Sequence, residues 1–246
     1  MNIQRMHHEI KLRSNKINSN HYPDLPTAFI DDFLNEAQDL LVESICYPKK
    51  QNRFGIEGIQ QDTDLISNIT ITDEPISVTL VSTGVYKLQL KNLSKKYKHI
   101  TKLKVTTSCG SIPIEIVNHN ELDAILTDEN RKPSSLWRRG VGVFTSNKDV
   151  DLNSDILIYT SNQYTISQAF ISYVYIPVKM FYGGYNTLES INGDVTAPTI
   201  ITPSINCELN INSHTYIVDY ACLLINGSLE NINGIQIGES KIQKTI

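Results

Sequence analysis

The stretch YTISQAFISYVYIP, residues 164–177, decides the fold class of this 246-residue chain. It is rich in β-branched and aromatic residues, which favour extended backbone, and Pro177 lacks the backbone N–H that would continue a strand. Shorter runs of the same kind precede it, around residues 76–80, 85–90, 100–105, 112–116, 141–144 and 155–160. Together they predict a β-rich domain over residues 73–180, with about six strands.

Helical patterns lie on both sides of this block. In residues 24–72, apolar residues recur at three- and four-residue steps up to Pro48, and a weaker pattern follows over 56–66, which predicts an N-terminal helical hairpin. Residues 212–234 predict a C-terminal helix that is interrupted at Asn226-Gly227. The acidic side of the first helix is interpreted as a solvated face rather than a metal site; its members are Asp31, Asp32, Glu36 and Asp39.

The remaining segments have no strong pattern. Residues 1–23 are polar and predict a flexible N-terminal arm or a frayed terminus, residues 181–211 a long loop, and residues 235–246 an extended tail. The fold class is therefore α+β. The helical hairpin and the C-terminal helix are expected to pack as a small bundle beside a mainly antiparallel β-sheet or sandwich block, without alternating βαβ units.

Composition excludes several classes of protein. The net charge is −4 and the pI about 5.9, which argues against a protein that coats nucleic acid. Isoleucine and asparagine are frequent, at about 13% and about 9%, which suits strands and loops. No stretch reaches 18 apolar residues and the first residues lack an apolar core, so we expect neither a membrane span nor a signal peptide.

No catalytic motif or cofactor fingerprint is present, so we expect no enzymatic activity and no cofactor. The cysteines are Cys46, Cys109, Cys207 and Cys222, and none of them forms a CxxC pair, so no zinc cluster is expected. One alternative stays open. His214 lies five residues before Asp219 and the pair could act in a hydrolase, although packing or capping is the favoured interpretation.

Basic side chains concentrate in two regions that form a possible interaction patch. The first follows residues 91–104 and the second surrounds Trp137; the patch comprises Lys95, Lys96, Lys98, Lys102, Lys104, Arg131, Lys132, Trp137, Arg138 and Arg139. These lysines could face DNA or an acidic partner, or they could be ordinary solvated residues. Trp137 could contact a partner or fill the core of the sheet.

Several short stretches, spread over about residues 22–225, share the pattern of one protein family. They are YPDLP at 22–26, FLNEAQ at 33–38, FGIE at 54–57, QQDTDL at 60–65, LSKKYKHI at 93–100, HNEL at 119–122, DENRKPS at 128–134, ISYVYIP at 171–177, and CEL at 207–209 followed by His214 and IVDYA at 217–221. In these stretches the chain resembles the head–tail connector proteins of crAss-like bacteriophages. The chain departs from the family at Ser94, where proline is frequent, and at Asn226-Gly227.

The resemblance implies a structural virion protein at the portal vertex, made in the host cytoplasm. It would form a ring, twelvefold by analogy, that bridges portal and tail and lines the channel through which genomic DNA passes without sequence-specific binding. Its partners would be copies of itself, the portal protein and neighbouring ring or tail proteins, with no membrane. The alternative is a virion-associated DNA- or protein-binding accessory module without catalytic activity.

Overall fold

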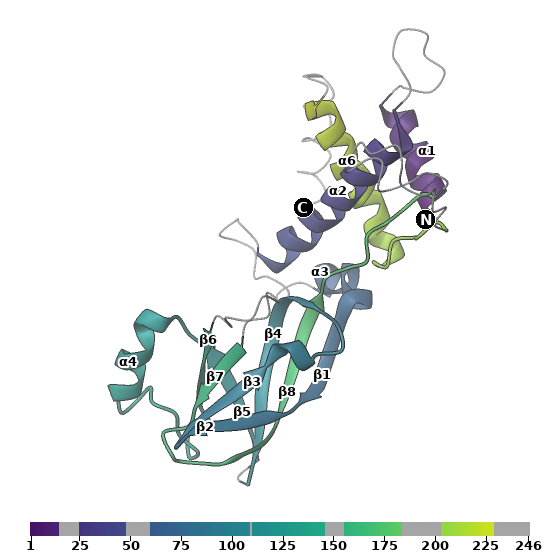
Figure 1. Cartoon of the computed structure of the whole chain (residues 1–246). Helices are drawn as coiled ribbons and strands as arrows, with labels where there is room; N and C mark the ends of the chain where they lie inside the picture. Colours follow the sequence, from purple (N-terminus) through teal and green to yellow (C-terminus); the bar gives the residue numbers. More distant parts are fainter. Residues whose placement is uncertain (15–24, 48–59, 109, 146–154, 184–202, 229–246) are drawn as a thin grey trace, which may run out of the picture. The chain divides into compact units, whose positions relative to one another are not determined.

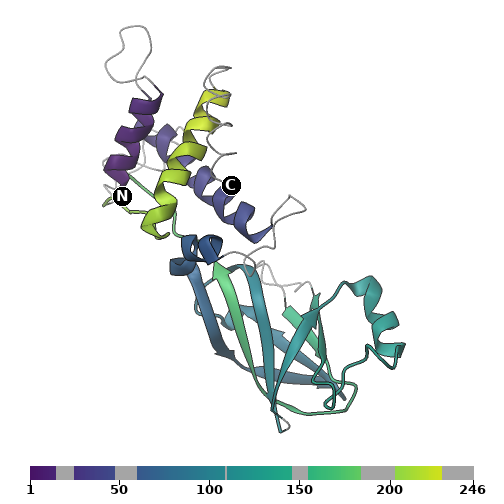
Figure 2. The ribbon, with the colours of Figure 1, turned by 180° about the vertical axis from the view of Figure 1, so that it is seen from behind.

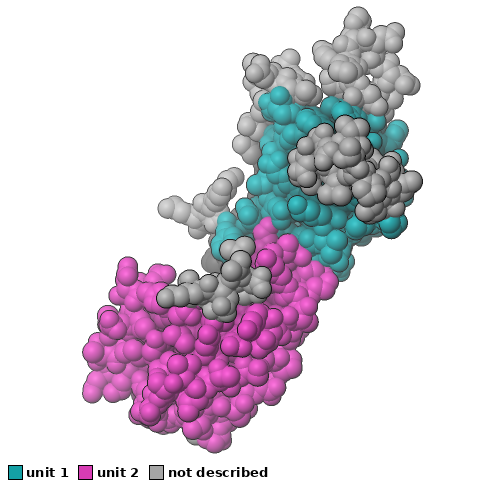
Figure 3. Space-filling model, viewed as in Figure 1, with its two compact units in different colours: residues 1–69, 177–246 teal, residues 70–176 magenta. Residues whose placement is uncertain are grey.

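The computed structural model describes residues 1–14, 25–47, 60–108, 110–145, 155–183 and 203–228 (Figure 1). The chain divides into two compact units (Figure 3). Unit 1 combines residues 1–69 with residues 177–246, and unit 2 consists of residues 70–176. The α+β class expected from the sequence is confirmed, with the helices of unit 1 and the sheet of unit 2 built from separate parts of the chain.

Unit 1 is built on the three helices α1 (Ile3–Arg13), α2 (Thr27–Cys46) and α6 (His214–Ser228). Helix α2 packs against α6, and α1 contacts both. Their apolar stripes share one core because the stripe residues recur at helical spacing; these residues include Ile3, Met6, Ile10, Ile30, Leu34, Ala37, Val42, Ile217, Val218, Ala221 and Ile225. The short elements α3 (Gln60–Leu65), η1 (Ser67–Ile69) and η3 (Ile211–Ser213) complete the unit.

Helix α1 corrects the prediction of a flexible arm over residues 1–23. The Asn2 side chain caps the helix by accepting a hydrogen bond of 3.0 Å from the backbone N–H of Arg5. Ile3, Met6 and Ile10 are buried, so this short helix is held by packing as well as by its cap. Residues 15–23 lie outside the described part of the chain.

The second segment of the predicted helical hairpin is described from residue 60 onward, where it forms α3, and the helices that pack along α2 are α6 and α1. Helix α6 continues through Asn226-Gly227 to Ser228 without the predicted interruption, because one glycine in a helix costs only about 1 kcal/mol relative to alanine. The remainder of the predicted helix, residues 229–234, and the predicted tail, residues 235–246, lie outside the described residues.

Unit 2 contains one eight-stranded sheet in the order β1-β8-β4-β5-β6-β7-β3-β2 (Figures 1 and 2). The strands are β1 (Thr70–Ile76), β2 (Val78–Ser82), β3 (Val85–Gln89), β4 (Tyr97–Thr107), β5 (Gly110–Ile116), β6 (Gly140–Thr145), β7 (Asp155–Tyr159) and β8 (Ile166–Tyr175). The sheet curls so that β2 at one edge contacts β8 near the other edge. Its interior is filled by alternate residues of the strands, including Leu88, Leu103, Val105, Ile112, Ile156, Ile158 and Ile171.

The sheet differs from the prediction at two places. Strand β1 begins at Thr70, three residues before the predicted β-rich domain, and its Pro75 is tolerated because β1 is an edge strand. The one-turn helix η2 (Leu90–Asn92) follows β3, and β4 starts at Tyr97, before the run around residues 100–105 that the sequence indicates.

The sheet is mainly antiparallel, as predicted, and one parallel pair interrupts it. Strands β5 and β6 run parallel and are joined through α4 (His119–Thr127), which packs Leu122 and Ile125 on Val141 and Val143. A crossover of this kind is what a parallel pair requires. The pair approaches closely because Gly142 leaves room for the side chain of Ile114.

We predict that Gly142→Ala destabilises the protein by about 1–3 kcal/mol. An added Cβ would lie 2.9 Å from Cγ2 of Ile114 and 3.3 Å from Cγ2 of Ile156, and these methyl groups branch directly from Cβ and cannot swing away. Urea denaturation measures the change. Gly227→Ala is the matched control, because its Cβ meets nothing and alanine favours the helix, so stability should stay equal or rise. Equal stability of Gly142→Ala and the wild type would contradict this account.

Candidate functional site

The basic residues singled out in the sequence all lie in unit 2, where they form two groups. The β4 group consists of Lys95, Lys96, Lys98, Lys102 and Lys104, on the strand β4 and the segment that enters it. The turn group lies between α4 and β6 and consists of Arg131, Lys132, Trp137, Arg138 and Arg139. They are described separately because their surroundings differ.

Two members of the β4 group are engaged within unit 2. The Lys104 ammonium lies 2.7 Å from Oδ2 of Asp73 and 5.3 Å from the ring centre of Phe170. The hydrogen bond from Lys104 lowers the pKa of Asp73. The Lys95 ammonium lies 4.4 Å from the ring centre of Tyr175, in cation–π geometry. Lys95, Lys96 and Lys102 are exposed, whereas Lys98 and Lys104 are half-buried, so only part of the predicted lysine run presents its charge outward.

The turn group surrounds a tight turn, residues 134–139, which we call the tryptophan turn. Ser134 and Arg139 form an antiparallel bridge, with N–H···O distances of 2.9 and 3.0 Å. Within it, the N–H of Arg138 donates to the carbonyl of Ser135 at 3.4 Å, and the N–H of Trp137 donates to Oγ of Ser134 at 3.4 Å. The turn therefore holds its shape through its own hydrogen bonds.

Residues outside the tryptophan turn also hold its base. The buried hydroxyl of Tyr164 donates to the carbonyl of Arg139 at 3.3 Å, and burial raises the pKa of Tyr164 to about 12. The Arg139 guanidinium donates to the carbonyl of Asn130 at 2.7 Å, which joins the turn to the loop before it. Pro133 is buried next to the turn. These contacts fix the turn at the start of β6, which lies between β5 and β7 in the sheet.

The tip of the turn carries two large apolar side chains in solvent. Trp137 is 77% exposed and the preceding Leu136 is 83% exposed. This excludes Trp137 as a plug in the sheet core and leaves the partner-contact interpretation. Leu136 was missed in the sequence, where nothing distinguished an isolated leucine beside a tryptophan from a core residue.

Arg138 adds a second unusual feature at the tip. Its φ is +47°, in the left-handed region that non-glycine residues seldom occupy. Backbone strain of this kind costs about 1–3 kcal/mol and occurs preferentially at binding and catalytic positions. The turn thus presents an apolar pair and an arginine in one fixed geometry.

The proposed His214–Asp219 pair is not formed. Nε2 of His214 lies 3.2 Å from the carbonyl of Leu209, and its Nδ1 lies 2.6 Å from the Met1 amino group. Asp219 instead forms an ion pair with Arg13 of α1. The two residues are five positions apart on α6 and each is used to fasten another segment, so the hydrolase alternative loses its geometric basis.

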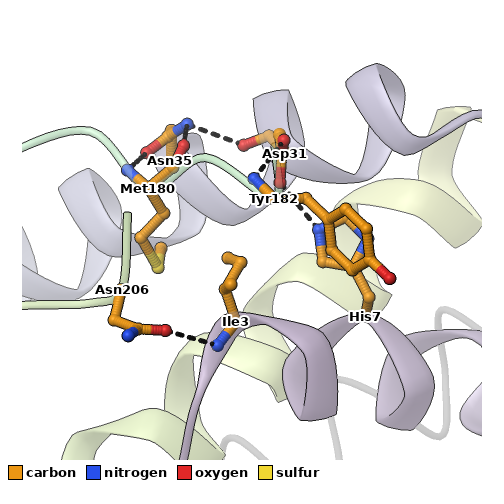
Figure 4. A network of polar contacts seen from close by, with 7 residues as sticks. All are labelled: Ile3, His7, Asp31, Asn35, Met180, Tyr182 and Asn206. Carbon is orange, nitrogen blue, oxygen red and sulfur yellow. Dashed lines mark hydrogen bonds and ion pairs between the residues drawn. The ribbon is translucent and has the colours of Figure 1, made fainter. Parts of the chain in front are cut away.

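A different histidine–carboxylate pair lies in the centre of unit 1 (Figure 4). Nε2 of His7 lies 2.7 Å from Oδ1 of Asp31, and the two residues are only 4% and 2% exposed. The backbone N–H of Tyr182 donates to Oδ2 of the same carboxylate at 2.9 Å, and the Tyr182 ring lies 4.6 Å from the His7 ring. This corrects the assignment of Asp31 to the solvated face of α2, while Asp32, Glu36 and Asp39 are exposed as expected.

The network continues along the segment that returns from unit 2. Asn35 accepts from the N–H of Met180 at 2.7 Å and donates to the carbonyl of the same residue at 3.0 Å, as a strand partner would (Figure 4). The side chain of Asn206 accepts from the N–H of Ile3 at 2.9 Å. These bonds join α1, α2 and the segments around residues 180 and 206. The network therefore holds these segments of unit 1 together.

The described ends of the predicted loop over residues 181–211 adjoin this network. Phe181 and Ile205 form an antiparallel bridge, and both Phe181 and Leu209 are buried. The described ends of the predicted loop are therefore held by contacts within unit 1. The central part, residues 184–202, lies outside the described residues.

Cys207, Cys46 and Cys222 are free thiols. Burial raises the pKa of Cys207 to about 11, and its sulfur donates to Oε1 of Gln38 at 3.3 Å. This thiol stays protonated at neutral pH and is a poor nucleophile. Cys109 lies outside the described residues.

Over the described ranges, no three His, Cys, Asp or Glu side chains gather in a way that could hold a metal ion. Within the same ranges, none of the helices combines the length and the apolar character needed to cross a bilayer.

The chain matches no protein-family model and no curated protein sequence. Functional interpretation therefore depends on the exposed tryptophan turn, the distribution of charge and the sequence resemblance.

We predict that His7→Ala destabilises the protein by about 3 kcal/mol, because it leaves the buried Asp31 carboxylate without its main partner. Urea denaturation followed by circular dichroism measures the change. His8→Ala is the matched control: His8 lies in the same turn of α1 but is exposed, so its loss should change stability by less than about 0.5 kcal/mol. If both substitutions changed the stability equally, the His7–Asp31 pair would not stabilise unit 1 as described.

We further predict that stability falls as the pH drops below about 6.5. Burial, with a smaller contribution from the Met1 amino group, lowers the pKa of His214 in the folded chain, so the unfolded chain binds more protons there and acid favours unfolding. Unfolding free energies at pH 7.5 and 5.5 test this. His214→Gln should lose less stability than the wild type over that interval, and an equal loss would refute the assignment.

Proposed function

We propose that this chain is a structural virion protein that forms an oligomeric ring in a phage head–tail connector, bridging portal and tail and lining the channel for DNA. The observation that carries the proposal is the tryptophan turn. Tryptophan and arginine dominate the energetically important positions of protein interfaces. A turn that holds Leu136 and Trp137 in solvent by its own hydrogen bonds is preorganised for such a contact.

The finer parts of the proposal are supported by the sequence resemblance. It covers about residues 22–225 and includes the strand that becomes β8 and the segment DENRKPS, which leads into the tryptophan turn. From it come the twelvefold ring, the portal and tail partners, the DNA that passes without sequence-specific contacts, and the place in the virion. The hydrogen bonds of His7, Asp31 and Asn35 in unit 1 suit a subunit that keeps its shape within an assembly.

A second candidate is a virion-associated accessory module that binds DNA or protein without catalytic activity. The exposed Lys96 and Lys102 favour it, because surface lysines on one strand can contact phosphates. DNA binding that weakens steeply with added salt and that is lost in Lys96→Gln/Lys102→Gln would favour this candidate over the ring.

We predict that the purified full-length chain assembles into closed oligomers at high protein concentration. Native mass spectrometry and light scattering measure the number of copies, and negative-stain electron microscopy shows whether they close. Rings with a central channel are the expected outcome. A chain that stays monomeric up to millimolar concentration, and that antibodies fail to detect in purified phage particles, would overturn the proposal.

A further inference from the structure

The two units of the chain carry opposite net charge. Unit 2 holds 12 Lys and Arg against 10 Asp and Glu, a formal net charge of +2. Of the chain's 22 basic and 26 acidic residues, unit 1 holds the other 10 and 16, a net charge of −6. A chain of this kind attracts further copies of itself when unit 2 of one copy meets unit 1 of another.

On unit 2, exposed basic side chains and exposed apolar side chains lie together at the tryptophan turn. Arg131, Arg138 and Arg139 are exposed around Leu136 and Trp137. An arginine rim around a protruding apolar pair fits a protein surface that is acidic and partly apolar. A leucine has no stacking function toward bases, so this composition favours protein over nucleic acid as the occupant.

On unit 1, helix α2 presents a surface of the matching kind. Its exposed acidic face consists of Asp32, Glu36, Asp39 and Glu43, which recur at steps of four, three and four and therefore lie in one row. Carboxylates in such a row can accept charge-assisted hydrogen bonds from the arginine side chains of another surface.

Apolar side chains accompany the acidic row along the same helix. Phe29 and Phe33 are half-buried and stack edge to face with ring centres 4.6 Å apart, and Leu40 is 37% exposed. At 100° per residue, these three positions lie together at one side of the acidic row. The surface of α2 thus offers aromatic contacts to Trp137 and carboxylates to the arginines.

We propose that the tryptophan turn of one copy docks on the acidic face of α2 of a second copy. This inference rests on the proposed ring and supplies its subunit contact. The two surfaces differ, so the contact is heterologous: each copy keeps one turn and one α2 face for the next neighbour, and successive contacts can close into a ring.

The test uses two full-length variants, each of which disables one side of the contact. The turn variant is Trp137→Ala/Arg138→Glu, and the helix variant is Asp32→Lys/Glu36→Lys. All four positions are exposed, so circular dichroism and thermal melting should match the wild type. Light scattering and analytical ultracentrifugation then measure assembly, and each variant alone should show at least tenfold weaker association than the wild type.

Mixing the two variants gives the decisive measurement. The helix variant keeps an intact turn and the turn variant keeps an intact α2 face, so the mixture can form one contact per pair and no further contact. The expected product is a one-to-one dimer that does not grow and that dissociates as salt is raised. Mixed samples that stay monomeric, or that assemble into wild-type oligomers, would overturn the proposed contact.

A matched control separates this contact from general charge effects. Lys96→Glu/Lys102→Glu reverses two exposed charges on unit 2, away from the turn, and should assemble within about twofold of the wild type. If this variant fails to assemble while the turn variant assembles normally, the contact is on the β4 group and the inference is wrong, although the ring stands. If the wild type itself never assembles, the proposed ring falls first.

Discussion

The buried Asp31 carboxylate is the constraint on which unit 1 depends. It accepts from the backbone of Tyr182 and pairs with His7, so one side chain of α2 holds both the first helix and the segment that returns from unit 2. A carboxylate taken out of water needs such partners, since leaving it unpaired costs several kilocalories per mole. The remaining bonds of the network, from Asn35 and Asn206, repeat the same arrangement with neutral amides that are cheaper to bury.

In unit 2, the packing of the strands β5 and β6 depends on the space between side chains. Gly142 lets β5 and β6 approach, and α4 covers the outer side of this parallel pair. The tryptophan turn leaves the same region and is held by Tyr164 from within the unit. A rigid sheet under a fixed turn is what allows large apolar side chains to stay in solvent without collapsing onto the surface. The interaction surface is therefore a property of the sheet and of the turn together.

Much of the fold could be predicted from the sequence, because β8, β3, β5 and α2 have strong periodicity. Helix α1 was missed since its buried stripe is short and includes His7, although Asn2 and the spacing of Ile3, Met6 and Ile10 were signals that could have found it. Asp31 was misplaced because a carboxylate beside Asp32 looks solvated until its partner, 24 residues away, is known. At the candidate site, Trp137, Arg138 and Arg139 could be identified from the sequence. Their exposure could not, because it depends on the Ser134–Arg139 bridge and on the distant Tyr164.

The order of the two units along the chain has a consequence for biosynthesis. Unit 2 is contiguous, and its first and last strands pair directly, with Thr70 opposite Val174. It can therefore fold as soon as residue 176 has left the ribosome. Unit 1 is split, and α1 and α2 must wait for residues 180–182 and for α6 before their apolar faces are covered. Translation thus delays the completion of unit 1 until after unit 2 has been made, which places the acidic face of α2 on the last part of the protein to mature.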